Sequence, residues 1–89
     1  MMEDVSFVEA DKVRLSVLKA LTSRKTPKDL AKTVGKSMPA VSRALRELRQ
    51  RNLVICLTPG RRKRRFYHLT DSGKQVLEEI QKASPRKTR

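Results

Sequence analysis

Apolar residues recur along most of the chain at the three- to four-residue spacing of an α-helix. The first such stretch predicts a helix that ends near Thr22, but two starts remain open. Ser6 forms a capping box with Glu9, and Asp11 is a second candidate cap. Residues 23–25 then form a polar connector or a stub of strand. The expected inward residues of this first helix are Val13, Val17, Leu18 and Leu21.

The next two helices have clear start and stop signals. Thr26 is a cap followed by proline, and the second helix runs to about Val34, where Gly35 stops it. Ser37 caps a third helix that runs to about Arg51, and the asparagine that follows can take the left-handed turn that ends it. The expected inward residues are Leu30, Ala31 and Val34 in the second helix and Met38, Val41, Ala44, Leu45 and Leu48 in the third.

After residue 52 the pattern becomes that of a β-hairpin. Residues 53–57 are a continuous apolar run, residues 58–60 have turn chemistry, and residues 66–69 supply a second, antiparallel strand. In the expected register Leu57 faces Phe66. The inner face of the hairpin then consists of Val54, Cys56, Tyr67 and Leu69, and the outer face of Ile55, Leu57, Phe66 and His68.

A final helix completes the predicted order of elements. Thr70 caps it, and Ser84 followed by Pro85 ends it. Its apolar residues at helical spacing are Val76, Leu77 and Ile80. We therefore divide the chain into an N-terminal segment (residues 1–10), one folded domain (residues 11–83) and a basic disordered tail (residues 84–89).

Composition points to a polyanionic partner. The chain has 22 basic and 9 acidic residues and a formal net charge of +13, and nucleic acid is the usual partner of such a domain. A basic membrane-surface protein is the alternative, but it would need a helix with aromatic residues on one face, and the chain has one Tyr, two Phe and no Trp. The acidic start of the chain does not fit a signal peptide. We expect a cytoplasmic protein with no membrane partner.

The residue types that carry most enzyme chemistry are scarce. Cys56 and His68 are the single cysteine and the single histidine, so no internal disulfide or usual zinc site can form within one copy. The sequence has no glycine-rich phosphate loop, nucleophile motif or catalytic carboxylate pair. We expect no enzyme, no metal and no cofactor. Cys56 is interpreted as a small buried hydrophobe, Tyr67 as a core residue and His68 as a strand-face residue.

Several stretches resemble a known family of regulators. Residues 30–45 resemble the helix-turn-helix pattern, with Gly35 in the turn. Residues 52–54 resemble the start of a wing, and residues 67–73 resemble the Tyr-x-Leu-Thr-x-x-Gly stretch that closes it. Over roughly residues 11–80 the chain is similar to small single-domain regulators of the MarR and ArsR type, notably the archaeal ones. The resemblance implies a mainly α winged helix-turn-helix with a three-helix core, a two-stranded wing and a C-terminal helix.

The same resemblance implies sequence-specific binding of double-stranded DNA, with the third helix (about residues 37–51) as the reader in the major groove. Arg43, Arg46 and Gln50 lie at offsets of three and four and share one stripe. Arg can bond guanine and Gln can bond adenine through paired hydrogen bonds. A solvated basic face is the alternative. The candidate DNA-binding residues of this helix are Lys36, Ser37, Ser42, Arg43, Arg46, Arg49 and Gln50.

The hairpin tip, residues 58–65, is the second candidate DNA contact. Five adjacent cations repel one another unless an anion lies near, which favours contact with the backbone or a narrow minor groove. A merely soluble tip and a targeting signal are the alternatives. The candidate wing residues are Arg61, Arg62, Lys63, Arg64 and Arg65.

We also expect a homodimer. Three of the four outer hairpin residues are apolar and need a cover, which either the N-terminal segment with Val5, Phe7 and Val8 or a second subunit would supply. Leu77 and Ile80 of the final helix are further candidates to pack against their copies across a two-fold axis. The alternative functions are a non-specific architectural DNA-coating protein and a winged helix that docks RNA or protein.

Overall fold

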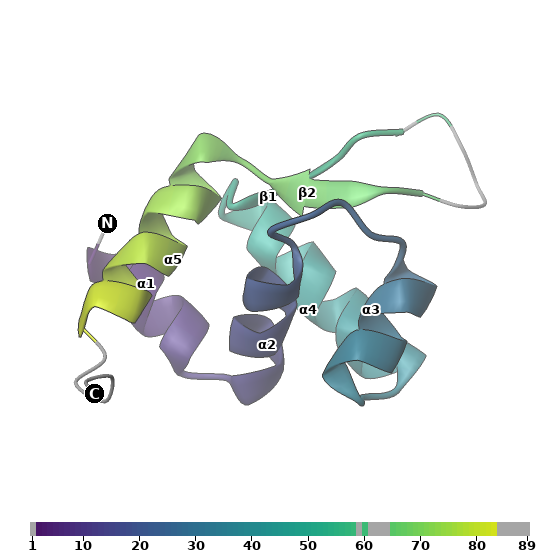
Figure 1. The fold of residues 1–89 in the computed structure, drawn as a ribbon, viewed down its shortest axis with the longest axis horizontal. Coiled ribbons are helices and arrows are strands. Elements are labelled where there is room, and N and C mark those ends of the chain that lie inside the picture. Colours follow the sequence, from purple (N-terminus) through teal and green to yellow (C-terminus); the bar gives the residue numbers. More distant parts are fainter. Residues whose placement is uncertain (1, 59, 61–64, 84–89) are drawn as a thin grey trace.

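The computed structural model describes residues 2–58, 60 and 65–83. Its elements are α1 (Met2–Glu9), α2 (Lys12–Ala20), α3 (Pro27–Val34), α4 (Met38–Gln50), β1 (Val54–Cys56), β2 (Tyr67–Leu69) and α5 (Asp71–Ala83). The hairpin projects from one side of the helical body (Figure 1). This order confirms a mainly α fold with a small β-hairpin. None of the described helices is long and apolar enough to span a membrane.

Asp11 separates two N-terminal helices. Its side chain accepts a hydrogen bond from the Val13 backbone N–H at 2.8 Å, and its backbone is extended, so α2 begins at the next residue. Ser6 lies inside α1 rather than at the start of the first predicted helix. The predicted end near Thr22 is also late, because α2 ends at Ala20.

The caps of α3 and α4 confirm the local signals in the sequence. Thr26 Oγ1 accepts a hydrogen bond from the Asp29 N–H at 3.2 Å, and Ser37 Oγ accepts one from the Ala40 N–H at 3.4 Å. Gly35 has a φ of 75°, the left-handed conformation that ends a helix at little cost for glycine. Asn52, just after α4, has the same left-handed conformation, with a φ of 62°.

One inward residue of α4 is not where the pattern predicts it. Val41, Ala44, Leu45 and Leu48 are buried as expected, but Met38 is 45% exposed. Met38 occupies the first position of α4, ahead of the core, and lines a surface groove instead.

The hairpin has the predicted register. Cys56 pairs with Tyr67, and the Leu57 N–H donates to the Phe66 carbonyl at 2.7 Å. Cys56 and Tyr67 are buried as expected, while the strands are three residues long, shorter than predicted. Lys25 resolves the open reading of residues 23–25, because its backbone exchanges two hydrogen bonds with Tyr67, at 3.1 and 2.9 Å, and extends the hairpin by a strand stub.

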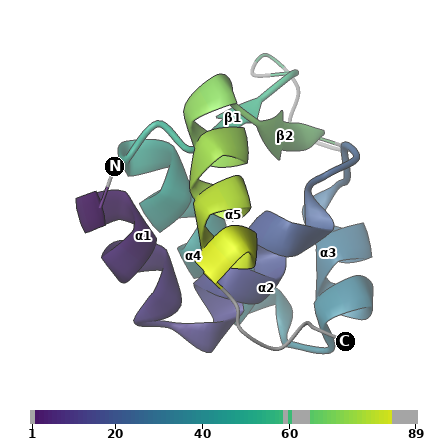
Figure 2. The ribbon, with the colours of Figure 1, turned by 60° about the vertical axis from the view of Figure 1, so that its left-hand side comes forward.

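The N-terminal helix corrects two expectations about exposed apolar surface. α1 packs on α2 and α5, with Val8 fully buried, and lies beside α5 in Figure 2. It does not cover the outer face of the hairpin, where Ile55 is 48% and Leu57 is 43% exposed. Leu77 and Ile80 are buried within this chain, so they do not form a surface for a second copy.

Candidate nucleic-acid interface

The outward side of α4 gathers the residues predicted to read DNA. The buried stripe of α4 packs into the core against α2 and α3, which fixes the opposite side toward solvent. The turn between α3 and α4 adds Lys36 and Ser37 at the start of this surface. The exposed candidate residues are Lys36, Ser37, Ser42, Arg43, Arg46, Arg49 and Gln50.

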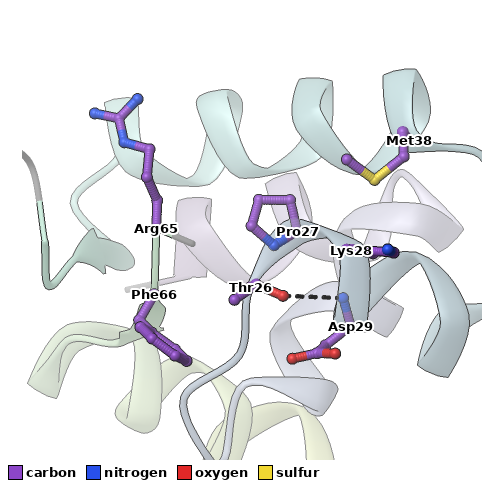
Figure 3. Close-up of a pocket in the computed structure, with 7 residues that line it drawn as sticks. All are labelled: Thr26, Pro27, Lys28, Asp29, Met38, Arg65 and Phe66. Atoms are coloured by element: carbon purple, nitrogen blue, oxygen red, sulfur yellow. Dashed lines mark hydrogen bonds between the residues drawn. The ribbon is translucent and has the colours of Figure 1, made fainter. Parts of the chain in front are cut away.

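A groove separates this surface from the hairpin. One hollow of about 230 Å³ is lined by Pro27, Ser42, Leu45, Arg46, Arg49 and Tyr67. A second hollow of about 490 Å³ is lined by Thr26, Pro27, Lys28, Asp29, Met38, Arg65 and Phe66 (Figure 3). The two hollows share Pro27, and we refer to both together as the wing groove. The basic side chains that line the wing groove are Lys28 and Arg65 in the larger hollow and Arg46 and Arg49 in the smaller one.

Arg65 is the wing residue whose placement the structure describes. It is half-buried, and its side chain points to the opposite side of the backbone from that of its neighbour Phe66 (Figure 3). The position of Arg65 in the groove brings the base of the wing beside α3 and α4. The other candidate wing residues, Arg61, Arg62, Lys63 and Arg64, lie outside the described residues, so their contact with DNA stays a prediction.

Lys28 is a groove residue that the sequence reasoning missed. It follows Pro27 in the first turn of α3, where the positive end of the helix dipole disfavours a cation. A lysine in the first turn of a helix does not stabilise that helix, so its presence in the sequence could have indicated a binding role for Lys28. Met38 and Phe66 were missed because each was expected to belong to an apolar surface of the fold, and both line the groove.

Glu47 connects α4 to the N-terminal part of the chain. Its carboxylate accepts hydrogen bonds from Arg14 Nε at 2.9 Å and from Arg43 Nε at 3.4 Å. The Arg14 hydrogen bond lowers the pKa of Glu47, against the opposing effect of burial, and Arg43 adds to the lowering. The sequence alone gives no sign of this pairing, because Arg14 lies 33 residues away from Glu47 in the chain.

The described residues include no cluster of side chains that could form a metal centre. Within residues 2–58, 60 and 65–83, no group of three or more His, Cys, Asp or Glu side chains is placed to hold a metal ion. His68 is half-buried on its strand, with Nδ1 at 3.0 Å from the Leu69 carbonyl oxygen. The chemistry that this surface offers is hydrogen bonding and positive charge.

A family model described as the HVO_A0261 N-terminal domain matches residues 2–87. The chain belongs to this family. No curated protein matches it in sequence. The matched residues include α1, the helix-turn-helix, the hairpin and α5, and therefore all the elements of this chain that form the candidate interface.

Solved structures of MarR-family regulators share the fold. A MarR-family transcriptional regulator from Silicibacter pomeroyi DSS is 23% identical, with a TM-score of 0.74 over 90% of this chain and 55% of that one. RV1404 from Mycobacterium tuberculosis is 20% identical, with a TM-score of 0.76 over 90% and 58%. A mutant of MepR from S. aureus, bound to an oligodeoxyribonucleotide, is 25% identical, with a TM-score of 0.67 over 81% and 55%.

These structures confirm the predicted winged helix fold and the resemblance to the MarR type. The chain spans little more than half the length of each of the three. They do not test the archaeal part of the resemblance, which stays a prediction.

Proposed function

We propose that this chain binds double-stranded DNA and regulates transcription, with α4 in the major groove and the wing on the backbone or in the minor groove. The observation that carries the proposal is the exposed polar and basic side of α4, which borders the wing groove. Two cations of α4, Arg46 and Arg49, line this groove together with Lys28 and Arg65. The matched MepR structure holds an oligodeoxyribonucleotide, which supports the same class of ligand for this fold.

The two parts of the surface suit two parts of a duplex. Arg43, Arg46 and Gln50 share the outermost stripe of α4, from which side chains can reach base edges. Lys28 and Arg49 line the wing groove beside that stripe, where they suit the phosphates of a strand that passes between α4 and the wing. The proposal therefore assigns base reading to Arg43, Arg46 and Gln50 and backbone contact to Lys28 and Arg49.

Arg46→Ala tests the assignment of base reading. We expect a loss of about 1–3 kcal/mol on a duplex selected by the wild-type chain from a random library, because a paired hydrogen bond to a base is removed. We expect a much smaller loss on a scrambled duplex of the same length. Fluorescence anisotropy titrations on both duplexes measure the two affinities at one fixed salt concentration.

Lys74→Ala is the matched control, since it removes one exposed cation from α5. It should change neither affinity appreciably. Equal losses on the two duplexes for Arg46→Ala would make Arg46 a phosphate contact. That result would favour the alternative function, an architectural protein that coats DNA with little sequence preference.

We further propose a homodimer on DNA. Ile55 and Leu57 leave an apolar patch on the outer face of the hairpin that no described element covers. Two copies would present two reader helices about one DNA turn apart, which matches a palindromic site. We expect sedimentation at micromolar concentration to give the mass of two chains. A monomer both in solution and on a duplex with paired half-sites would contradict this proposal.

A further inference from the structure

Glu47 is the single acidic residue of α4, and it lies beside the cations of the reader surface. Its side chain is 24% exposed, and each carboxylate oxygen has its own basic partner. Oε1 accepts from Arg14 and Oε2 accepts from Arg43. A carboxylate at the edge of a surface that binds DNA repels the phosphates and so lowers the affinity for DNA. Glu47 at this position therefore needs an explanation other than affinity.

Arg14 fixes the position of the Glu47 carboxylate from outside the reader helix. The Arg14 side chain is only 17% exposed, and its Nη1 donates to the Phe7 carbonyl oxygen at 2.7 Å. Its guanidinium also lies 3.9 Å from the centre of the Phe7 ring. Charge-assisted hydrogen bonds in a partly buried setting are stronger and less screened by salt than those on an open surface. Glu47 is therefore held in one place by α1 and α2.

Arg43 is held by this fixed carboxylate through one atom only. Its side chain is 74% exposed, and among the described residues its hydrogen bond to Glu47 uses Nε alone. A guanidinium carries five N–H donors, four of them on the two terminal nitrogens. The terminal pair is the edge that bonds the two acceptors of guanine. Glu47 can thus orient Arg43 and still leave it the edge needed for a base.

We infer that Glu47 is a specificity-determining residue of the reader helix, which positions Arg43 for a base edge and withholds it from phosphates. The inference rests on the proposed function, because it assumes that α4 reads DNA. Two effects act in the same direction. Orientation of Arg43 strengthens binding to the correct sequence, and the hold of Glu47 on Arg43 keeps this cation from the phosphates, which weakens the sequence-independent attraction to the backbone.

Glu47→Gln is the direct test, because it keeps the size of the side chain and removes the charge. The ratio of affinities for the selected and the scrambled duplex should fall about tenfold, since the better part of one paired base contact is lost. The salt dependence on the scrambled duplex should steepen by up to about 0.9, since Arg43 becomes able to take a phosphate.

Glu79→Gln is the matched control. It makes the same change in net charge on α5. Glu79 is exposed there, and its Oε2 lies 4.0 Å from Lys82 Nζ. This variant should leave both the ratio and the salt slope at wild-type values. A general effect of added positive charge would instead move the two variants together, and that outcome would overturn the inference.

Arg43→Ala supplies the second arm. If Glu47 acts through Arg43, Glu47→Gln should change neither the ratio nor the salt slope further in a chain that already carries Arg43→Ala. An undiminished effect of Glu47→Gln in that background would also overturn the inference, because Glu47 would then act through the fold alone.

Arg43→Lys decides the question even where Glu47→Gln fails to fold, because it leaves the Arg14–Glu47 pair intact. Lysine keeps the charge but lacks the paired donors. It should lower the affinity for the selected duplex about tenfold and spare the scrambled one. Equal affinities for wild type and Arg43→Lys on both duplexes would reject the role of Glu47.

Failure of the proposed function gives a different result from failure of this inference. If the wild-type chain bound no duplex, the proposed function itself would fail. If it bound the selected duplex and the variants had no effect, only the role of Glu47 would fail.

Discussion

Gly73→Ala is expected to destabilise the fold by about 3 kcal/mol, at the upper end of the range for overpacking a buried site. Gly73 is buried in the first turn of α5, and an added Cβ would collide with the backbone carbonyl oxygen of Leu53. A backbone atom cannot move aside as a side chain can. For a domain of this size the melting temperature should fall by roughly 15 °C, which circular dichroism measures directly.

The surrounding hydrogen bonds explain why the Leu53 carbonyl cannot retreat. It accepts from the Thr70 N–H at 3.1 Å, and Thr70 Oγ1 donates to the Asn52 carbonyl at 2.7 Å. The same hydroxyl accepts from the Gly73 N–H at 3.0 Å and so caps α5. Thr70 and Gly73 therefore lock the start of α5 to the start of the hairpin, which gives the Thr-x-x-Gly part of the wing-closing stretch a physical reason.

Gly60→Ala is the control for this substitution. A Cβ at Gly60 would meet nothing within 4 Å in the structure, so the melting temperature should stay at the wild-type value. A Gly73→Ala chain that melts with the wild type would mean that α5 shifts along the hairpin at no cost. The close approach of the two backbones would then not be a constraint on the sequence.

Local sequence signals were sufficient for most of the helical fold. The caps Thr26 and Ser37 and the stop at Gly35 act within a few residues of themselves, so their geometry follows from residue type alone. The register of the hairpin likewise followed from the alternation of inner and outer residues. The separate helix α1 did not, because a helix of eight residues depends on tertiary packing, here through Val8, for its stability.

Some features of the candidate site could also be predicted from local sequence, and others depend on contacts between distant residues. Exposure of Arg43 and Arg46 follows from the helical period, and it was predicted. The wing groove exists because Lys25 pairs with Tyr67 and brings the start of α3 beside the base of the wing. That pairing joins residues 42 positions apart through backbone atoms, which carry no mark in the side-chain pattern. The partnership of Arg14 with Glu47 was hidden for the same reason.

Removal of three wing charges should have the largest effect on DNA affinity. We expect Arg61→Ala, Arg62→Ala and Arg64→Ala together to lower the affinity for every duplex by about 10²-fold at physiological salt, since all three are proposed to contact phosphates. The slope of log affinity against log salt should flatten by up to about 2.7, because each lost phosphate contact accounts for about 0.9. Titrations on the selected and the scrambled duplex at several salt concentrations measure both quantities.

The pattern of loss separates the wing from the reader helix. Phosphate contacts carry no sequence information, so the triple variant should bind both duplexes more weakly by the same factor, in contrast to Arg46→Ala. A chain with Lys19, Lys74 and Lys82 replaced by Ala loses the same charge from exposed positions on α2 and α5. If this control flattened the salt slope as much as the wing variant, the attraction would come from net charge alone. The wing would then have no place in the DNA interface, and the contact would reside in α4 and the groove beside it.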